Sequence, residues 1–154
     1  QAYSMKMTLS KAVQTTIGEL TKEYLELKNA LVASNPEQAK TVAASAAQKA
    51  KNTSNMQTDK MVKTHLLDLV DQFTLIASKD DVAQQRTVFI PLSQNMIQLA
   101  KQLKKLDDKL YVQHCPMANN DKGADWLSSE KEIRNPYFGS AMLRCGAVTD
   151  TLGN

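Results

Sequence analysis

The fold class follows first from residues 9–31, which read LSKAVQTTIGELTKEYLELKNAL. Apolar side chains recur here at steps of three and four residues, the spacing that places them on one face of an α-helix. The series consists of Leu9, Val13, Ile17, Leu20, Tyr24, Leu27 and Leu31. The pattern therefore predicts a long amphipathic helix that buries one face against other parts of the protein.

A second helix is predicted directly after this one. Asn35, Pro36 and Gln38 supply an N-cap, a proline at the first helical position and a glutamine at the third. The polar stretch 52–55 is expected to end the helix. Small side chains form a stripe that would let neighbouring helices pack closely, namely Ala39, Val42, Ala43, Ala46, Ala47 and Ala50.

Two further helices are predicted before about residue 110. The third covers about 58–78, and the fourth follows Asp80 and Asp81, which can cap it, and extends through Leu106. Pro91 lies inside the fourth helix. It should kink this helix rather than end it, because the apolar pattern resumes beyond the proline.

Four helices joined by short connections favour an antiparallel bundle. The composition changes from Tyr111 onward, where four of the five glycines, both cysteines and the single tryptophan are found. We therefore expect an all-α fold in a single domain, residues 1–154, with an antiparallel four-helix bundle over about 8–110 and a loop-rich, irregular segment over about 111–154. That segment is expected to pack on the bundle through Trp126, Ile133, Tyr137 and Phe138.

Composition and charge exclude several classes of function. The net charge of +3 is too small to indicate nucleic acid or an anionic membrane as a partner. No apolar run reaches the roughly 18 residues that span a bilayer. No glycine-rich phosphate loop or nucleophile elbow is present, so we predict no enzymatic activity. The chain starts at Gln1 without a signal peptide, which suggests a processed or trimmed form.

The C-terminal segment points most directly to chemistry, because each of its two cysteines has a methionine nearby. Cys115 and Met117 lie two residues apart, so an extended backbone directs both side chains to one face. Met142 and Cys145 lie three residues apart, the spacing of one face of a helical turn. Two thiols and two thioethers form a soft set of ligands that selects Cu(I) or a similar ion. The spacing thus favours a metal site made by these four residues.

A structural disulfide is the alternative. A Cys115–Cys145 bridge would close a loop of about 30 residues and stabilise the fold by roughly 3–4 kcal/mol. Met117 and Met142 would then fill gaps in an irregular core, and the aromatic side chains of the segment would serve packing or a protein partner. Buried free thiols are a third alternative, and the spacing leaves all three open.

The two histidines are the remaining candidate ligands. His114 precedes Cys115 and could replace one of the sulfurs, in which case Zn(II) would become a candidate ion. Neighbouring residues in an extended chain point to opposite faces, however, which favours a surface or hydrogen-bonded histidine. His65 lies on the apolar stripe of the third helix, between Met61 and Leu69, where we expect a hydrogen-bonded histidine at the edge of the core.

Four motifs of the C-terminal segment resemble a bacterial envelope family that is classed as a domain of unknown function. They are YVQHCPMA at 111–118, GADWLS at 123–128, EIRNPYFG at 132–139 and MLRCG at 142–146. Residues 24–32 of the first helix, YLELKNALV, are also similar. This domain occurs alone and as a C-terminal extension of periplasmic adaptor subunits of copper/silver efflux pumps. The Cys-Pro-Met start also resembles short heavy-metal-binding modules of copper-transport proteins.

The resemblance implies a non-catalytic protein that handles heavy metals and is periplasmic or lipid-anchored upstream of Gln1. It also implies a ligand role for the residues at the motif positions, Cys115, Met117, Met142 and Cys145. A pump-subunit role is not implied, because the chain has no efflux-adaptor barrel or hairpin. We therefore predict a periplasmic protein that binds Cu(I) or Ag(I) and exchanges it with an envelope efflux or metal-transfer protein. The alternative is a disulfide-stapled interaction module of the envelope without metal.

Overall fold

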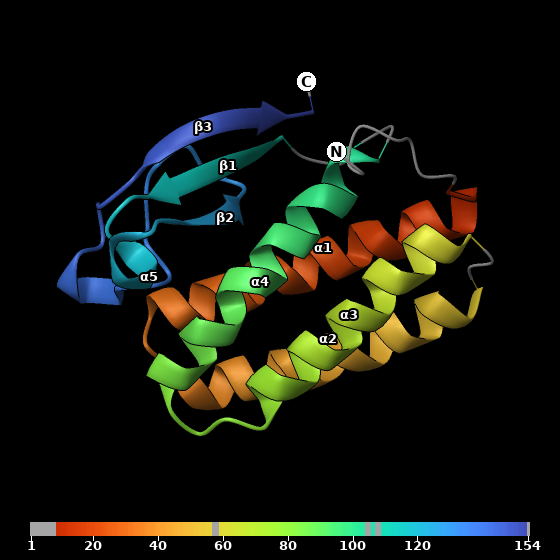
Figure 1. Ribbon diagram of the computed structural model, residues 1–154, viewed down its shortest axis with the longest axis horizontal. Helices are drawn as coiled ribbons and strands as arrows, with labels where there is room; N and C mark the ends of the chain where they lie inside the picture. The colour runs from red at the N-terminus through yellow and green to blue at the C-terminus, as the bar shows by residue number, and fades with distance from the viewer. Residues whose placement is uncertain (1–8, 57–58, 104–105, 107–108, 154) are drawn as a thin grey trace.

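The computed structural model describes residues 9–56, 59–103, 106 and 109–153. Four helices form its first part: α1 (Lys11–Val32), α2 (Pro36–Met56), α3 (Lys60–Ala77) and α4 (Val82–Lys101). They pack as a bundle, with α2 between α1 and α3 and with α4 against α3 and α1 (Figure 1). None of these helices is long and apolar enough to cross a membrane in the part of the chain described.

Side chains cap the helices where the sequence predicted. The Asn35 side-chain oxygen accepts a hydrogen bond from the Gln38 backbone N–H at 3.1 Å, and α2 begins at Pro36. Asp59 caps α3 and Asp81 caps α4 in the same way. These caps satisfy backbone donors that have no partner within the helix, so the cap residues fix where each helix starts.

The ends of two helices differ from the prediction. Helix α2 continues through the polar stretch 52–55 to Met56. Helix α4 continues past Pro91 as predicted, but it ends at Lys101 and does not extend to Leu106. The backbone N–H groups of residues 102 and 103 bond three residues back, to Leu99 and Ala100, at 3.0 and 3.2 Å. Such tightened turns end the α-helical ladder.

The predicted apolar stripe of α1 forms the centre of the core. Val13, Ile17, Leu20, Tyr24, Leu27 and Leu31 are at most 1% exposed. The small-residue stripe of α2 is buried as well, apart from the half-buried Ala47, and its small side chains let α2 approach both neighbouring helices closely. One hydrophobic cluster joins these residues to Cys115, Trp126 and Leu127 of the C-terminal segment.

The C-terminal segment is not irregular, and the all-α prediction is therefore wrong for this part. It forms a three-stranded antiparallel sheet from β1 (Leu110–Cys115), β2 (Ala124–Ser128) and β3 (Ala147–Leu152), in the order β2-β1-β3. The short helix α5 (Ala118–Asp121) joins β1 to β2, and a 3-10 turn, η2 (Gly139–Ala141), lies in the connection to β3. Strand β1 is buried at four of six positions and β3 is exposed at five, so neither alternates clearly enough to be recognised from its sequence.

The sheet meets the bundle along the outer edge of β2 (Figure 1). The Leu127 N–H donates a hydrogen bond to the Tyr24 hydroxyl of α1 at 3.1 Å, and that hydroxyl lies 2.7 Å from the Ser93 hydroxyl of α4. The Tyr137 hydroxyl donates to the Asp125 carbonyl of β2 at 2.7 Å. Two tyrosines therefore supply the partners that an edge strand normally lacks.

Aromatic rings continue this junction into the core. Tyr24 stacks on Phe89 at 5.1 Å between ring centroids, Phe89 contacts Tyr137 at 5.7 Å, and Tyr137 meets the edge of Trp126 at 5.9 Å. Trp126 is fully buried, and Ile133 and Phe138 pack against the same core. The prediction that these aromatic and apolar side chains hold the segment on the bundle is confirmed.

Candidate metal centre

Strand β1 divides the candidate ligands between two faces of the sheet. Successive side chains of a strand alternate between faces, and directly paired residues of neighbouring strands share one. Gln113 and Cys115 therefore lie on the face that carries Trp126, whereas His114 lies on the other face with its partner Asp125. An ion or disulfide that involves Cys115 can therefore include only groups that reach the same face of the sheet.

The loop 129–146 covers that face of the sheet. The Gln113 side-chain amide, which is fully buried, donates to the carbonyls of Glu130 and Lys131 at 2.8 and 3.3 Å. At the far end of the loop, Gly146 has φ +140°, and a Cβ there would lie 2.8 Å from the His114 carbonyl oxygen. Only glycine lets the loop pass this close to β1, and the passage brings its neighbour Cys145 to the end of the strand.

Asn135 holds the loop in shape from its centre. Its side chain is fully buried, and its oxygen accepts from the backbone N–H groups of Tyr137 and Phe138 at 2.8 and 3.2 Å. Its side-chain nitrogen donates to the Cys145 carbonyl at 2.8 Å, and its backbone N–H donates to the Leu143 carbonyl at 2.8 Å. One residue thus ties the beginning of the 135–145 turn to its end and fixes the backbone of Cys145.

Arg86 of α4 connects the same loop to the bundle. Its Nε donates to the Pro136 carbonyl at 2.7 Å, while its Nη2 donates to the Leu31 carbonyl at 2.7 Å and to the Ser34 hydroxyl at 3.0 Å. Gly139 lies against this guanidinium with φ +59°, and a Cβ there would come within 2.8 Å of Nη2. These contacts hold the Asn-Pro-Tyr-Phe-Gly motif (135–139) against the bundle. The motif in turn positions the segment that carries Met142 and Cys145.

The loop 129–146, held by Asn135 and Arg86, brings the two cysteines into contact. Their Sγ atoms lie 2.7 Å apart although the residues are 30 positions apart in the chain, and both are free thiols in the structure. Cys115 is fully buried at the end of β1, whereas Cys145 is partly exposed. The neighbouring Cys115 thiol, with a smaller contribution from burial, raises the pKa of Cys145, and a hydrogen bond from the Met117 backbone partly opposes this rise.

The two methionines flank this pair. Met117 follows Cys115 in the turn after β1, its backbone faces Cys145, and its side chain is 48% exposed. Met142 is half-buried and begins the turn that ends at Cys145, whose N–H donates to the Met142 carbonyl at 3.1 Å. The structure thus places Cys115 at the end of β1, Met117 in the turn that follows it, and Met142 and Cys145 together in a second turn.

The remaining ligands of any bound ion would have to come from sulfur or from another molecule. Among the residues that the structure describes, no three histidine, cysteine, aspartate or glutamate side chains cluster closely enough to hold a metal ion. Two thiols alone leave the coordination of most metals incomplete. The thioethers of Met117 and Met142 are the candidate sulfur donors nearest in the chain to the thiols.

His114 is separated from the thiol pair. Its Nδ1 lies 2.7 Å from an Asp125 carboxylate oxygen, across the β1–β2 pair, and its ring lies over Gly123. The prediction of a hydrogen-bonded histidine is confirmed. Its partner Asp125 was not predicted, because the pairing depends on the strand register, which the spacing of residues does not reveal.

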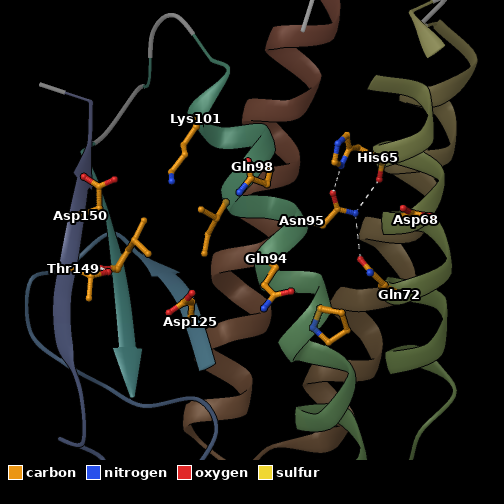
Figure 2. Close-up of a pocket in the computed structure, with 13 residues that line it drawn as sticks. His65, Asp68, Gln72, Gln94, Asn95, Gln98, Lys101, Asp125, Thr149 and Asp150 are labelled. Carbon is orange, nitrogen blue, oxygen red and sulfur yellow. Dashed lines mark hydrogen bonds between the residues drawn. The ribbon is translucent and has the colours of Figure 1, made fainter. Parts of the chain in front are cut away.

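His65 makes the hydrogen bond expected at the edge of the core, with its Nδ1 2.7 Å from the Asn95 side-chain oxygen. Asn95 also donates to the His65 carbonyl at 3.1 Å (Figure 2). Both residues line a polar cleft of about 610 Å³ between α3, α4 and the sheet, which the sequence did not predict. Asp125 lines it too, so the cleft reaches the sheet face opposite Cys115 and is separate from the thiol pair.

Comparison with known proteins places the helical part of the chain in a family. The model of a family described as "Protein of unknown function (DUF3347)" matches residues 20–108, more than half of the 154 residues. The match runs from within α1 to just before β1, so Cys115 and Cys145 lie outside it. No curated protein and no solved structure gives a significant match.

Proposed function

This chain belongs to the DUF3347 family of proteins of unknown function, and we propose that it is a non-catalytic heavy-metal-binding protein of the cell envelope. In this proposal Cys115 and Cys145 hold a soft monovalent ion such as Cu(I) or Ag(I), and Met117 and Met142 complete its coordination. Thiolates and thioethers are the ligands that such ions prefer.

The contact between the two thiols carries the proposal. Two sulfurs that bind one ion at about 2.3 Å each lie roughly 3.5–4.5 Å apart, so the pair must open by about 1–2 Å from its present 2.7 Å. Cys115 is fixed in a strand, whereas Cys145 lies in a partly exposed turn. A small movement of the Cys145 side chain is therefore sufficient to admit an ion.

The donor set also supports a monovalent ion over Zn(II). Two thiolates already balance more than the charge of one Cu(I), and thioethers add ligands without adding charge. Zn(II) prefers nitrogen or further thiolates, but the ring of His114 is bonded to Asp125 on the other face of β1.

The envelope location and the partner are parts of the same proposal. They rest on the resemblance of the motifs at 111–146 to an envelope family that also extends copper/silver efflux adaptors. The exposure of Met117 beside the partly exposed Cys145 suits the transfer of an ion to an efflux or metal-transfer protein, because an incoming ligand can reach the ion from solvent.

The same contact favours a second candidate, a disulfide-stapled interaction module without metal. A Cys115–Cys145 bridge would fasten the loop 129–146 to β1 and stabilise the fold by roughly 3–4 kcal/mol. In that case the loop held by Asn135 and Arg86 would present a rigid surface to a protein partner rather than an ion-binding turn.

Competition for Cu(I) separates the two candidates. We expect the fully reduced protein, titrated without oxygen, to remove one equivalent of Cu(I) from a coloured Cu(I) chelator. Cys145→Ser should abolish this competition, and Met117→Leu and Met142→Leu should each weaken binding by about tenfold, equivalent to about 1.4 kcal/mol. Met56→Leu is the matched control, because Met56 is 49% exposed and lies at the end of α2.

Two outcomes would contradict the proposal. One is a reduced protein that removes no Cu(I) from the chelator and is isolated fully oxidised without reductant, which would establish the stapled module instead. The other is equal weakening by Met56→Leu and Met117→Leu, which would place the bound ion away from the thiol pair.

A further inference from the structure

We propose that the thiol pair is a redox gate with a fixed order of reaction, in which Cys145 reacts first with an external disulfide and Cys115 then closes the bridge. The gating of metal rests on the proposed function, whereas the order of thiol reactions does not. The proposal follows from the unequal surroundings of two sulfurs that are already in contact.

Exposure distinguishes the two thiols. Cys115 is 0% exposed, because β1 is central in the sheet and its Cys115 end is paired with Ala124 of β2. Cys145 is partly exposed in a turn between the exposed residues Arg144 and Ala147. A molecule that must align with a sulfur for attack can reach Cys145 but not Cys115, since thiol–disulfide exchange depends on access to the attacking sulfur.

The chemistry then proceeds in two exchange steps. The Cys145 thiolate attacks a small disulfide, RSSR, which forms a mixed Cys145–SR disulfide and expels one RS⁻. Cys115 gives up its proton and attacks the Cys145 sulfur, which forms the Cys115–Cys145 bond and expels the second RS⁻. Each RS⁻ takes up one proton, so overall two protein thiols are oxidised and one RSSR is reduced to two RSH.

Closure requires little movement of the backbone. The Cys145 carbonyl accepts from the buried Asn135 side chain at 2.8 Å, and the Cys145 N–H bonds to Met142. Both hydrogen bonds use main-chain atoms of Cys145. The Cys145 side chain can therefore form or break a disulfide while the backbone of the turn stays in place. The bridge removes both thiolates from any ion, and an ion held by both thiolates blocks the attack on RSSR.

The order of reaction is tested without any metal. Reduced protein is mixed with oxidised glutathione, and intact mass is followed with time. We expect wild type to lose two thiols without retaining glutathione. Cys115→Ser should stop with one glutathione bound, and Cys145→Ser should react at least tenfold more slowly. Circular dichroism checks that both variants fold, and Cys115→Ala replaces Cys115→Ser if the buried hydroxyl prevents folding.

Equal rates for Cys145→Ser and Cys115→Ser would overturn the order, and so would a wild-type protein that keeps its bound glutathione. The gate is tested separately by measuring the initial rate after adding one equivalent of Ag(I), which we expect to slow closure at least tenfold. If Ag(I) binds at the thiols but closure is not slowed, the gate is wrong and the proposed function stands. If Ag(I) does not bind, the proposed function fails, and the mass experiment alone decides the order.

Discussion

Asn135 is the residue on which the position of Cys145 depends most directly. Its amide makes three hydrogen bonds, to two backbone N–H groups and to the carbonyl of Cys145, and it is fully buried. No other side chain of similar size offers both an acceptor and a donor in this arrangement, because aspartate lacks the donor. The thiol contact is thus set by a residue that cannot itself bind a soft ion.

Replacing this amide should loosen the turn. We expect Asn135→Ala to lower the free energy of unfolding by roughly 2–4 kcal/mol, because it leaves the buried Tyr137 N–H, the part-buried Phe138 N–H and the Cys145 carbonyl without partners. Urea denaturation of the reduced protein measures the change, and Asn52→Ala, whose side-chain oxygen accepts from Gln48 at the exposed surface of α2, should change it by less than about 0.5 kcal/mol. Equal effects of the two substitutions would show that Asn135 does not hold the loop.

Lys28 is a second residue for which we make a prediction, because its charged side chain is buried. It is 2% exposed, and burial lowers the pKa of its ammonium group, with Glu130 raising it and Arg134 lowering it further. Between the lowered pKa of the folded state and the ordinary pKa of the unfolded state, the unfolded chain binds more protons. The free energy of unfolding should therefore rise with pH through that interval, and the cost of burying the charge is fully present below the lowered pKa of the folded state.

Lys28→Met removes this charge and should raise the free energy of unfolding at about pH 7, with a smaller gain at about pH 10. Urea denaturation of both proteins at the two pH values measures the difference. Lys51→Met, at an exposed position of α2, is the control and should leave the stability nearly unchanged. A Lys28→Met protein less stable than wild type at neutral pH would mean that the ammonium group stabilises the fold.

At the scale of elements, the helices could be predicted and the strands could not. Repeated steps of three and four residues in α1, together with caps such as Asn35 and Asp81, are local signals that survive in the fold. The strands have five or six residues, and their burial is set by what covers them: the loop 129–146 covers Gln113, whereas β3 lies at an open edge. Burial that depends on a covering loop produces no regular spacing of apolar residues in the sequence.

The hydrogen bond between Tyr24 of α1 and Leu127 of β2 leads to a prediction about how the sheet is held on the bundle. Tyr24→Phe should lower the free energy of unfolding by about 1–3 kcal/mol, because the Leu127 N–H at the edge of β2 loses its buried acceptor. Tyr111→Phe serves as control, since it removes the hydroxyl of a half-buried tyrosine of β1 and leaves the Tyr24–Leu127 hydrogen bond in place. Hydrogen exchange at Leu127 should speed up in Tyr24→Phe alone, and unchanged exchange there would show that the hydroxyl does not protect the edge.

At the scale of the whole molecule, the sequence predicted a site of four sulfur-bearing residues, and it did not show how Cys115 and Cys145 come into contact. The mirrored Cys-Met pairs and the motifs around them identified Cys115, Met117, Met142 and Cys145. The contact between the two thiols depends on Asn135, ten positions before Cys145, and on Arg86 of the distant helix α4, and neither was predicted as part of the site. Which faces of β1 carry Cys115 and His114 could be anticipated from alternation, whereas the Asp125 partner required the register.

In the proposed function, sulfur atoms from the end of β1 and from the 142–145 turn bind one soft ion. X-ray absorption at the copper edge of the protein loaded with one equivalent of Cu(I) tests it most directly, because the spectrum reports which elements are bonded to the metal. We expect only sulfur around copper in wild type and fewer sulfur atoms in Met142→Leu. Nitrogen or oxygen as the main neighbours of copper, or an identical spectrum for Cys145→Ser, would contradict it.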